Sequence, residues 1–175
     1  MSRQHTSATD LELTARGEEQ ALALAPALAG PAFALVLTSP LKRARRTAEL
    51  AGFSGAEVDE DLFEYRYGDY EGLTTVEIRQ ERPDWDLWRD GCPGGETTAE
   101  VAARADRFVA RVRGAGGPVL AFSSGHISRV LGARFLGLPG EAGGMLILGT
   151  ASLSVLGSEH GHPAISRWND RSHLG

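Results

Sequence analysis

Residues 122–130, FSSGHISRV, place small polar residues and a histidine where an apolar run gives way to a helical pattern. Small residues between a buried strand and a helix start present backbone N–H groups that can bind an anion. Ser124 and Gly125 are therefore predicted to line an anion site, to which Ser124 adds a hydroxyl. His126 brings an imidazole, the side chain best suited to proton transfer near neutral pH.

A second stretch, TSPLKRARRTAEL at residues 38–50, concentrates positive charge just after another apolar run at residues 33–37. Charge runs are usually the solvated face of a helix, and we assign Lys42, Arg45 and Arg46 to that role. Arg43 lies in the first helical turns after the predicted buried strand. A guanidinium there can hold an anion through two parallel hydrogen bonds.

Strands and helices alternate along the chain, which indicates an α/β fold with a largely parallel sheet. The predicted helices run from Thr14 to a stop at Gly30, from Pro40 to Leu50, and over residues 74–82, 96–113 and 126–136. The predicted strands cover residues 33–37, 57–59, 118–123, 145–148, 152–157 and 163–168. Thr38, Ser39 and Pro40 are expected to cap the second helix, because proline suits the first helical position.

Length and composition predict one domain over residues 1–175, with 42% hydrophobic and 23% charged residues, as in ordinary globular proteins. No apolar run is long enough to span a membrane, and the net charge of −5 argues against a nucleic-acid partner. The N-terminus lacks the apolar core of a signal peptide, and the single cysteine, Cys92, excludes an internal disulfide. We therefore expect a cytoplasmic protein. No cofactor or metal site is predicted, since no Cys-rich zinc spacing occurs and the late histidines show no ligand spacing.

Four ordered motifs together resemble the histidine phosphatase superfamily, also called the phosphoglycerate mutase-like family. They are TDLELTARGEEQA at 9–21, TSPLKRARRTAEL at 38–50, LFEYRYGDYEGLT at 62–74 and the stretch at 119–131. WDLWRDGCPGGET at 85–97 resembles the branch of small acid phosphatases and sugar-bisphosphate phosphatases. The resemblance implies a three-layer α/β/α fold of the phosphoglycerate mutase-like type. It also implies descent from phosphomonoesterases that act on small phosphorylated metabolites.

In that family a histidine nucleophile takes the phosphoryl group, two arginines and a second histidine hold its oxygens, and a carboxylic acid protonates the leaving oxygen. By this resemblance Arg43 binds phosphate and Glu64 is the proton donor. His5 and Thr6 resemble a substrate-side segment that follows the nucleophile, although an exposed terminal histidine is the alternative. Glu96 is expected to be a plain carboxylate in the first turn of a helix.

The sequence departs from the family pattern at both catalytic histidines. The family's first strand and its Arg-His-Gly motif should precede residue 9, and the chain begins too late to hold them. The second catalytic histidine of the family falls on Ser124, and His126 corresponds to the following position of the branch. Because the first strand lies inside the family's sheet, we expect a gap closed by sheet rearrangement, by strand exchange or by a partner in a homodimer.

Three functions remain open from the sequence. The first is an impaired or inactive phosphatase. The second is a non-catalytic phosphate-binding or interaction protein that keeps Arg43 and the helix start at Gly125. The third is an enzyme with divergent chemistry built on Glu64 and His126. The partner expected is phosphate or a small phosphorylated metabolite, with neither nucleic acid nor membrane.

Overall fold

The computed structural model describes residues 4–175. Its helices are α1 (Ala15–Leu28), α2 (Lys42–Leu50), α3 (Thr75–Glu81), α4 (Leu87–Asp90), α5 (Thr98–Arg113) and α6 (Gly125–Phe135). Its strands are β1 (Leu35–Thr38), β2 (Glu57–Val58), β3 (Val119–Phe122), β4 (Leu153–Glu159) and β5 (His162–Asp170). Short 3-10 turns are η1 (Glu60–Leu62), η2 (Gly68–Tyr70), η3 (Gly140–Met145) and η4 (Ser172–Leu174). No helix among these residues is long and apolar enough to cross a membrane.

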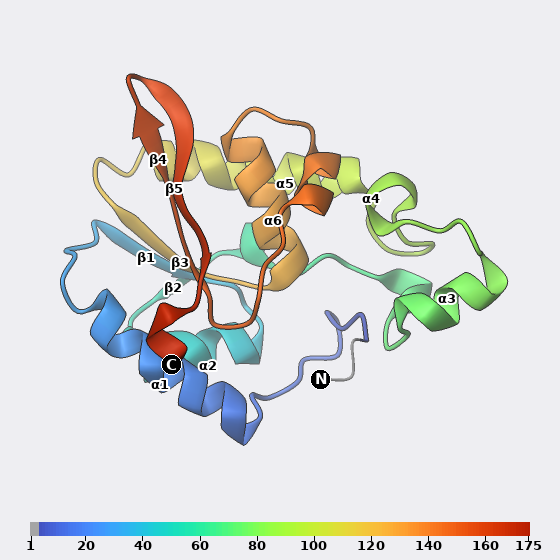
Figure 1. The fold of residues 1–175 in the computed structure, drawn as a ribbon, viewed down its shortest axis with the longest axis horizontal. Coiled ribbons are helices and arrows are strands. Elements are labelled where there is room, and N and C mark those ends of the chain that lie inside the picture. The colour runs from blue at the N-terminus through green and yellow to red at the C-terminus, as the bar shows by residue number, and fades with distance from the viewer. Residues whose placement is uncertain (1–3) are drawn as a thin grey trace.

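The parallel sheet has β1 at its centre, between β2 and β3 (Figure 1). Leu37 of β1 lies opposite Glu57 on one side, and Leu35 lies opposite Val119 on the other. The two four-residue strands of this sheet, β1 (LVLT) and β3 (VLAF), are almost wholly apolar. This composition is typical of parallel strands that are covered on both faces.

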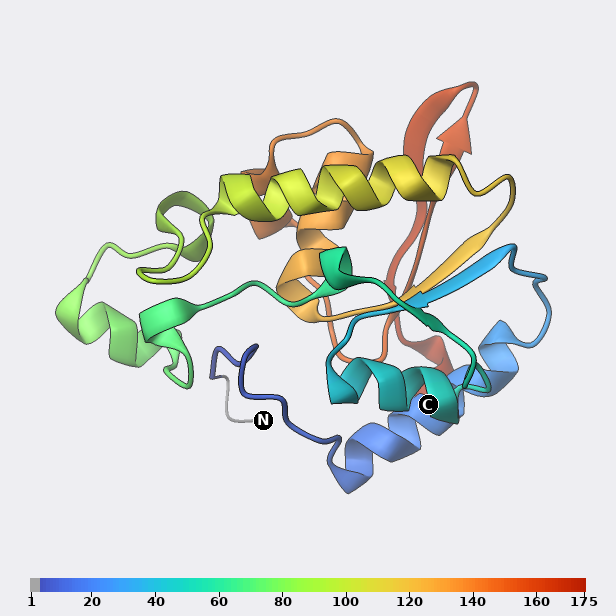
Figure 2. The same ribbon diagram turned by 180° about the vertical axis from the view of Figure 1, so that it is seen from behind.

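Helices pack on both faces of this sheet, so the predicted α/β/α layering is confirmed. On one face Leu37 packs with Val101 of α5 and Ile127 of α6 in a buried core. On the other face Phe122 packs with Leu24 of α1 and with α2 in a second core. Figures 1 and 2 show α1 and α2 on one side of the strands and α5 and α6 on the other.

The last two strands form a sheet of their own. β4 and β5 pair antiparallel, with Glu159 opposite His162. His160 and Gly161 make the turn between them with φ of 50° and 82°. Two consecutive positive φ angles are the geometry of a tight hairpin that matches the strand twist. The sheet content is therefore parallel in β1–β3 and antiparallel in the hairpin.

The strand predicted at residues 145–148 does not form, and that prediction is wrong. η3 ends at Met145, and the following segment has side-chain partners instead of a neighbouring strand. The Trp168 indole donates to the Ile147 carbonyl at 2.7 Å, and the Gly149 amide donates to the Asn169 side-chain oxygen at 2.8 Å. Met145 and Ile147 are exposed. The apolar run thus lacks a ladder partner, and only Leu146 and Leu148 are partly buried.

Helix α2 begins two residues later than predicted, with Leu41 at the N-cap position. The Leu41 amide donates to the Ser39 hydroxyl at 3.4 Å, and the Lys42 amide donates to the carboxylate of Asp10 at 2.8 Å. A residue from before α1 therefore satisfies a first-turn amide of α2. Such a distant cap is invisible to local sequence rules.

Candidate functional site

Arg43 stands in the first turn of α2, where the carboxyl ends of β1 and β3 meet. Its Nη2 donates to the Thr6 carbonyl at 3.1 Å and to the Ser124 hydroxyl at 3.4 Å. Its Nη1 is buried and has no acceptor within residues 4–175. A buried donor without an acceptor costs free energy, so an anion beside Ser124 would meet a donor already in place.

The side chain of Glu64 caps the N-terminus of α6. Its two carboxylate oxygens accept the amides of His126 at 3.1 Å and of Ile127 at 2.9 Å. One of them also accepts the Tyr65 amide at 2.9 Å. The amides of His126 and Ile127 are therefore engaged by Glu64 and are not free to bind an anion. Within the described chain the Gly125 amide is the first-turn donor that stays without a partner.

A buried ion pair positions the loop that carries Glu64. Arg104 of α5 pairs with Glu96 at 2.7 Å, and both side chains are nearly buried. The Arg104 guanidinium also donates to the carbonyls of Asp61 at 2.8 Å and Phe63 at 2.9 Å. Because these bonds hold the backbone on the N-terminal side of Glu64, the carboxylate is delivered to α6 in one orientation.

His126 and His5 lie against the ring of Tyr67. The Tyr67 hydroxyl is 2.6 Å from Nδ1 of His126. The His5 ring centroid lies 4.9 Å from that of Tyr67 and 5.9 Å from that of His126. His5 Nε2 is 3.2 Å from the Thr75 hydroxyl oxygen. One ring nitrogen of each imidazole is therefore already engaged.

Burial sets the charge of this cluster. It lowers the pKa of His126 below its ordinary value. Burial, helped by repulsion from His126, lowers the pKa of His5 to about 4. Burial also raises the pKa of Tyr67, so its hydroxyl stays protonated. At pH 7 the cluster is thus a pair of neutral imidazoles around a neutral phenol.

The N-terminal segment is tied to the site by Glu71. The Glu71 carboxylate accepts the Ser7 amide at 2.7 Å, the Ser7 hydroxyl at 2.9 Å and the Thr9 amide at 3.0 Å. Burial pushes the pKa of Glu71 upward, but these hydrogen bonds outweigh it and lower the pKa in sum. His5 is buried as a result, so the alternative of an exposed terminal histidine is wrong.

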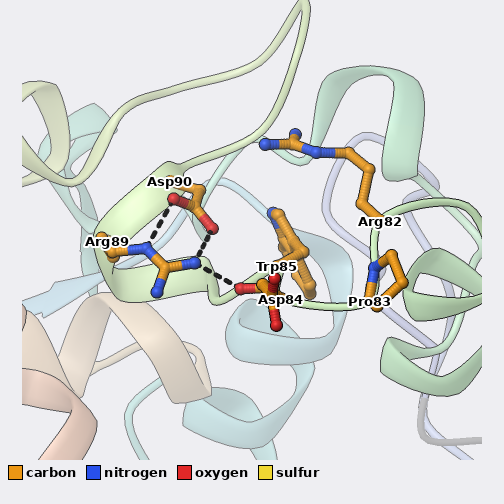
Figure 3. Close-up of a pocket in the computed structure, with 6 residues that line it drawn as sticks. All are labelled: Arg82, Pro83, Asp84, Trp85, Arg89 and Asp90. Atoms are coloured by element: carbon orange, nitrogen blue, oxygen red, sulfur yellow. Dashed lines mark hydrogen bonds and ion pairs between the residues drawn. The ribbon is translucent and has the colours of Figure 1, made fainter.

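A hollow of about 250 Å³ opens beside α4 (Figure 3). Arg89 donates there to the carboxylate of Asp90 and to the carbonyl of Asp84, and Arg82 donates to a tyrosine hydroxyl at 2.9 Å. Trp85 lines the hollow, and its ring centroid is 5.7 Å from that of His5. The arginines in the hollow thus have partners, which leaves the unsatisfied donor at Arg43.

The structure brings every residue singled out from the sequence into one region between α2, α6 and the N-terminal segment. They are Arg43, Ser124, Gly125, Thr6, Glu64, His126 and His5. Sequence reasoning missed Tyr67 as the partner of His126 and Arg104 as the anchor of the Glu64 loop. It also placed Glu96 in a helical turn, whereas α5 begins at Thr98. The available sequence signal for Arg104 was its spacing, three residues after Val101 and four before Phe108, which places it on the face of α5 that is buried in the structure.

Comparison with known proteins gives consistent matches over most of the chain. The model of the family described as histidine phosphatase superfamily (branch 1) matches residues 1–171. An acid phosphatase of Mycobacterium tuberculosis is 43% identical over 90% of this chain and 79% of its own length. The sedoheptulose 1,7-bisphosphatase of Saccharomyces cerevisiae is 36% identical, covering 78% of this chain and 63% of its own.

Solved structures agree with these matches. The structure of an open reading frame from Mycobacterium tuberculosis superimposes with a TM-score of 0.91 at 39% identity, covering 95% of this chain and 89% of that one. A mycobacterial glucosyl-3-phosphoglycerate phosphatase, solved as a VO3 complex, gives a TM-score of 0.84 at 32% identity, covering 96% of this chain and 91% of that one.

Proposed function

This chain belongs to the histidine phosphatase superfamily, and on that premise we propose that it binds the phosphate group of a small phosphorylated metabolite at Arg43 and hydrolyses it slowly or not at all. The first half of the proposal concerns binding, and the second concerns catalysis. Each half has its own support.

The observation that carries the binding half is the buried Nη1 of Arg43, which lacks an acceptor among residues 4–175. The Ser124 hydroxyl lies 3.4 Å from Nη2, and the Gly125 amide follows it as the first residue of α6. A guanidinium, a hydroxyl and a backbone amide are the donor types that bind phosphate oxygens. Names of relatives such as acid phosphatase and sedoheptulose 1,7-bisphosphatase support a small phosphate ester as the ligand.

The catalytic half rests on the residue types at the two imidazole positions of the family pattern. Ser124 occupies one of them, and the tripeptide Arg-His-Gly occurs nowhere in the 175 residues. A serine hydroxyl needs a base to become nucleophilic. Among the described residues the Ser124 oxygen accepts a hydrogen bond from the Arg43 cation, which is no base. His5 is buried and hydrogen-bonded to Thr75, and His126 is half-buried and hydrogen-bonded to Tyr67.

Titration with inorganic phosphate, followed by amide NMR shifts, tests the binding half. We expect shifts centred on Ser124 and Gly125 with a millimolar dissociation constant, which corresponds to about 4 kcal/mol. Arg43→Ala should abolish these shifts. Arg45→Ala, which removes an exposed arginine of the same helix, should leave them unchanged. Identical titrations in the parent and in Arg43→Ala would show that Arg43 is not the binding group.

A second candidate is an enzyme that uses Glu64 and His126, and the 2.6 Å contact between Tyr67 and His126 favours it. A phenol on Nδ1 fixes the orientation of the ring, as partners of catalytic histidines do. This candidate predicts turnover that disappears in His126→Gln and survives in Arg45→Ala. The first candidate predicts slow turnover or none, and no loss specific to His126→Gln.

A further inference from the structure

The hydrogen bond between Tyr67 and His126 leaves one proton position to be assigned. The Tyr67 hydroxyl oxygen and Nδ1 of His126 lie 2.6 Å apart, and which of them donates depends on the tautomer of the imidazole. A neutral imidazole carries hydrogen on one ring nitrogen and a lone pair on the other. If Nδ1 carries the hydrogen, Nε2 is an acceptor and a base. If the hydroxyl donates to Nδ1, Nε2 carries the N–H and is a donor.

The phenol decides between these two arrangements. Tyr67 is 2% exposed, and within residues 4–175 its hydroxyl has Nδ1 of His126 as its hydrogen-bond partner and no other. Burial raises the pKa of Tyr67, so the hydroxyl keeps its hydrogen. A buried O–H group needs an acceptor, and the available one is Nδ1. The hydroxyl therefore donates to Nδ1, and the N–H of His126 lies on Nε2.

His126 stays neutral in this arrangement. Burial lowers its pKa more than attraction to the Glu64 carboxylate raises it, and the Arg129 cation lowers it further. The Arg129 guanidinium is held in place, because its Nε donates to the Gly143 carbonyl at 2.9 Å and it lies 4.4 Å over the Trp88 ring. A second positive charge on His126 would face this fixed cation. The imidazole therefore keeps a single N–H at pH 7.

Nε2 of His126 is available to a ligand. In the part of the chain that the structure describes it has no hydrogen-bond partner, and it is not among the buried side-chain atoms left unpartnered there. The Trp88 ring packs edge-on against the imidazole, with the centroids 5.4 Å apart, so packing and the Tyr67 hydroxyl together fix the ring. The anion site is close, because Gly125 precedes His126 and the charge of Arg43 lowers the pKa of Tyr67 against the effect of burial. A donor of fixed direction therefore lies beside the proposed phosphate site.

We propose, on the premise that phosphate binds at Arg43, that Tyr67 is a positioning residue that holds His126 as a donor, and that Nε2 of His126 binds a hydroxyl or ether oxygen on the carbon skeleton of the ligand. Arg43, Ser124 and Gly125 supply the donors for the phosphate oxygens. A neutral N–H among aromatic rings suits an uncharged oxygen attached to carbon. The ligand class is therefore a phosphate ester of a polyol or sugar, in preference to an ester of a plain alkyl alcohol.

Long-range proton–nitrogen correlation NMR of the imidazoles tests the tautomer in the free protein. In the parent at pH 7, His126 should show hydrogen on Nε2 and a hydrogen-bonded lone pair on Nδ1. Tyr67→Phe removes the donor, so the Nδ1 resonance should shift downfield and the second tautomer should appear. Tyr70→Phe, which removes a hydroxyl bonded to Arg82 instead, should leave the His126 resonances unchanged. A role of Tyr67 in packing alone would not move them, because phenylalanine keeps the ring.

Two esters with the same phosphate group and the same number of carbons test the ligand class. Glycerol 3-phosphate carries hydroxyl groups on its carbon chain, and n-propyl phosphate carries none. The parent should bind glycerol 3-phosphate about fivefold more tightly, as one additional hydrogen bond provides. His126→Phe should remove this preference and leave the binding of inorganic phosphate unchanged, whereas His126→Gln, which retains a donor, should keep part of it. Tyr67→Phe should reduce the preference, which provides the same test if His126→Phe does not fold.

Three results would overturn the proposal. The first is hydrogen on Nδ1 of His126 in the parent, which would make Nε2 an acceptor. The second is an unchanged Nδ1 resonance in Tyr67→Phe. The third is equal binding of the two esters by a protein that binds inorganic phosphate, which would refute the ligand class and leave the phosphate site intact. Absence of binding by inorganic phosphate and by both esters would contradict the proposed function and, with it, the assigned ligand class.

Discussion

At the residue scale, the negative charge of the Glu64 carboxylate is stabilised by the amides in the first turn of α6. The carboxylate accepts backbone amides of His126, Ile127 and Tyr65, and a helix N-terminus favours negative charge. Glu64→Gln removes that charge and replaces one acceptor oxygen by a donor that faces these amides. We expect the free energy of unfolding to fall by about 1–3 kcal/mol, measured by urea denaturation. Glu60→Gln, at an exposed position on the same loop, should change it by much less.

His5 makes a second residue-scale prediction, on pH. Its pKa is about 4 in the folded protein and near its ordinary 6.5 when unfolded, so the unfolded chain binds more protons between these values. The stabilisation associated with neutral His5 is complete above pH 6.5 and is lost as the pH falls toward 4. Urea midpoints measured over this window should fall less steeply in His5→Gln than in the parent. His162→Gln, at an exposed histidine, should follow the parent curve.

Residue identity alone made the site region predictable, but not its hydrogen bonds. Small residues after an apolar run pointed to Ser124 and Gly125, and a position early in a helix pointed to Arg43. The next two amides of the helix, those of His126 and Ile127, are bound by Glu64, which lies 62 and 63 residues earlier in the chain. Nothing local to either stretch shows that a carboxylate already fills the helix start. Long-range contacts of this kind depend on the tertiary fold.

At the element scale, α5 fixes the loop that delivers Glu64, and two arginines on it offer a matched comparison. Arg104 is nearly buried and binds Glu96 and two loop carbonyls. Arg107, one turn later, binds Asp61 with an exposed guanidinium. Arg104→Ala should cost about 3–5 kcal/mol because it leaves Glu96 unpaired in a buried place. Arg107→Ala should cost less than about 1 kcal/mol.

The measurement is chemical denaturation of both variants, with amide shifts of residues 61–64 as a local readout. We expect these shifts in Arg104→Ala and not in Arg107→Ala. Equal losses of stability in the two variants would show that the buried pair has no special role in holding the loop.

The boundaries of a helix or strand were predictable where its apolar pattern was strong and the signals that end it lie close by in the sequence. Helix α5 and strand β3 differ from their predicted ranges by two residues or fewer. The run at residues 145–148 has strand-like composition, yet the Trp168 indole binds the carbonyl of Ile147 and the Asn169 side chain binds the amide of the following Gly149. Composition predicts what a segment prefers, and the available partner decides what it forms.

At the scale of the whole molecule, local and net charge have opposite signs. The chain carries a net charge of −5, whereas residues 42–46 of α2 are strongly basic. Phosphate should therefore be attracted only near Arg43, and salt should screen that attraction. We expect the apparent phosphate dissociation constant to rise several-fold between low salt and 0.5 M sodium chloride. A constant that does not move with salt would mean that the binding donors are fully buried.

Turnover is the property that depends on the whole arrangement. The proposed impairment assumes a site without an imidazole nucleophile, and losing the nucleophile from a concerted site typically costs roughly 10⁴–10⁶ in rate. Purified protein should therefore hydrolyse p-nitrophenyl phosphate no faster than Arg43→Ala prepared in parallel, because both would show only background. Ser124→His should not raise the rate either, since it supplies an oxygen-binding imidazole without a nucleophile. A rate well above that of Arg43→Ala, retained through further purification and lost in His126→Gln, would contradict the impaired-phosphatase proposal and establish chemistry built on His126.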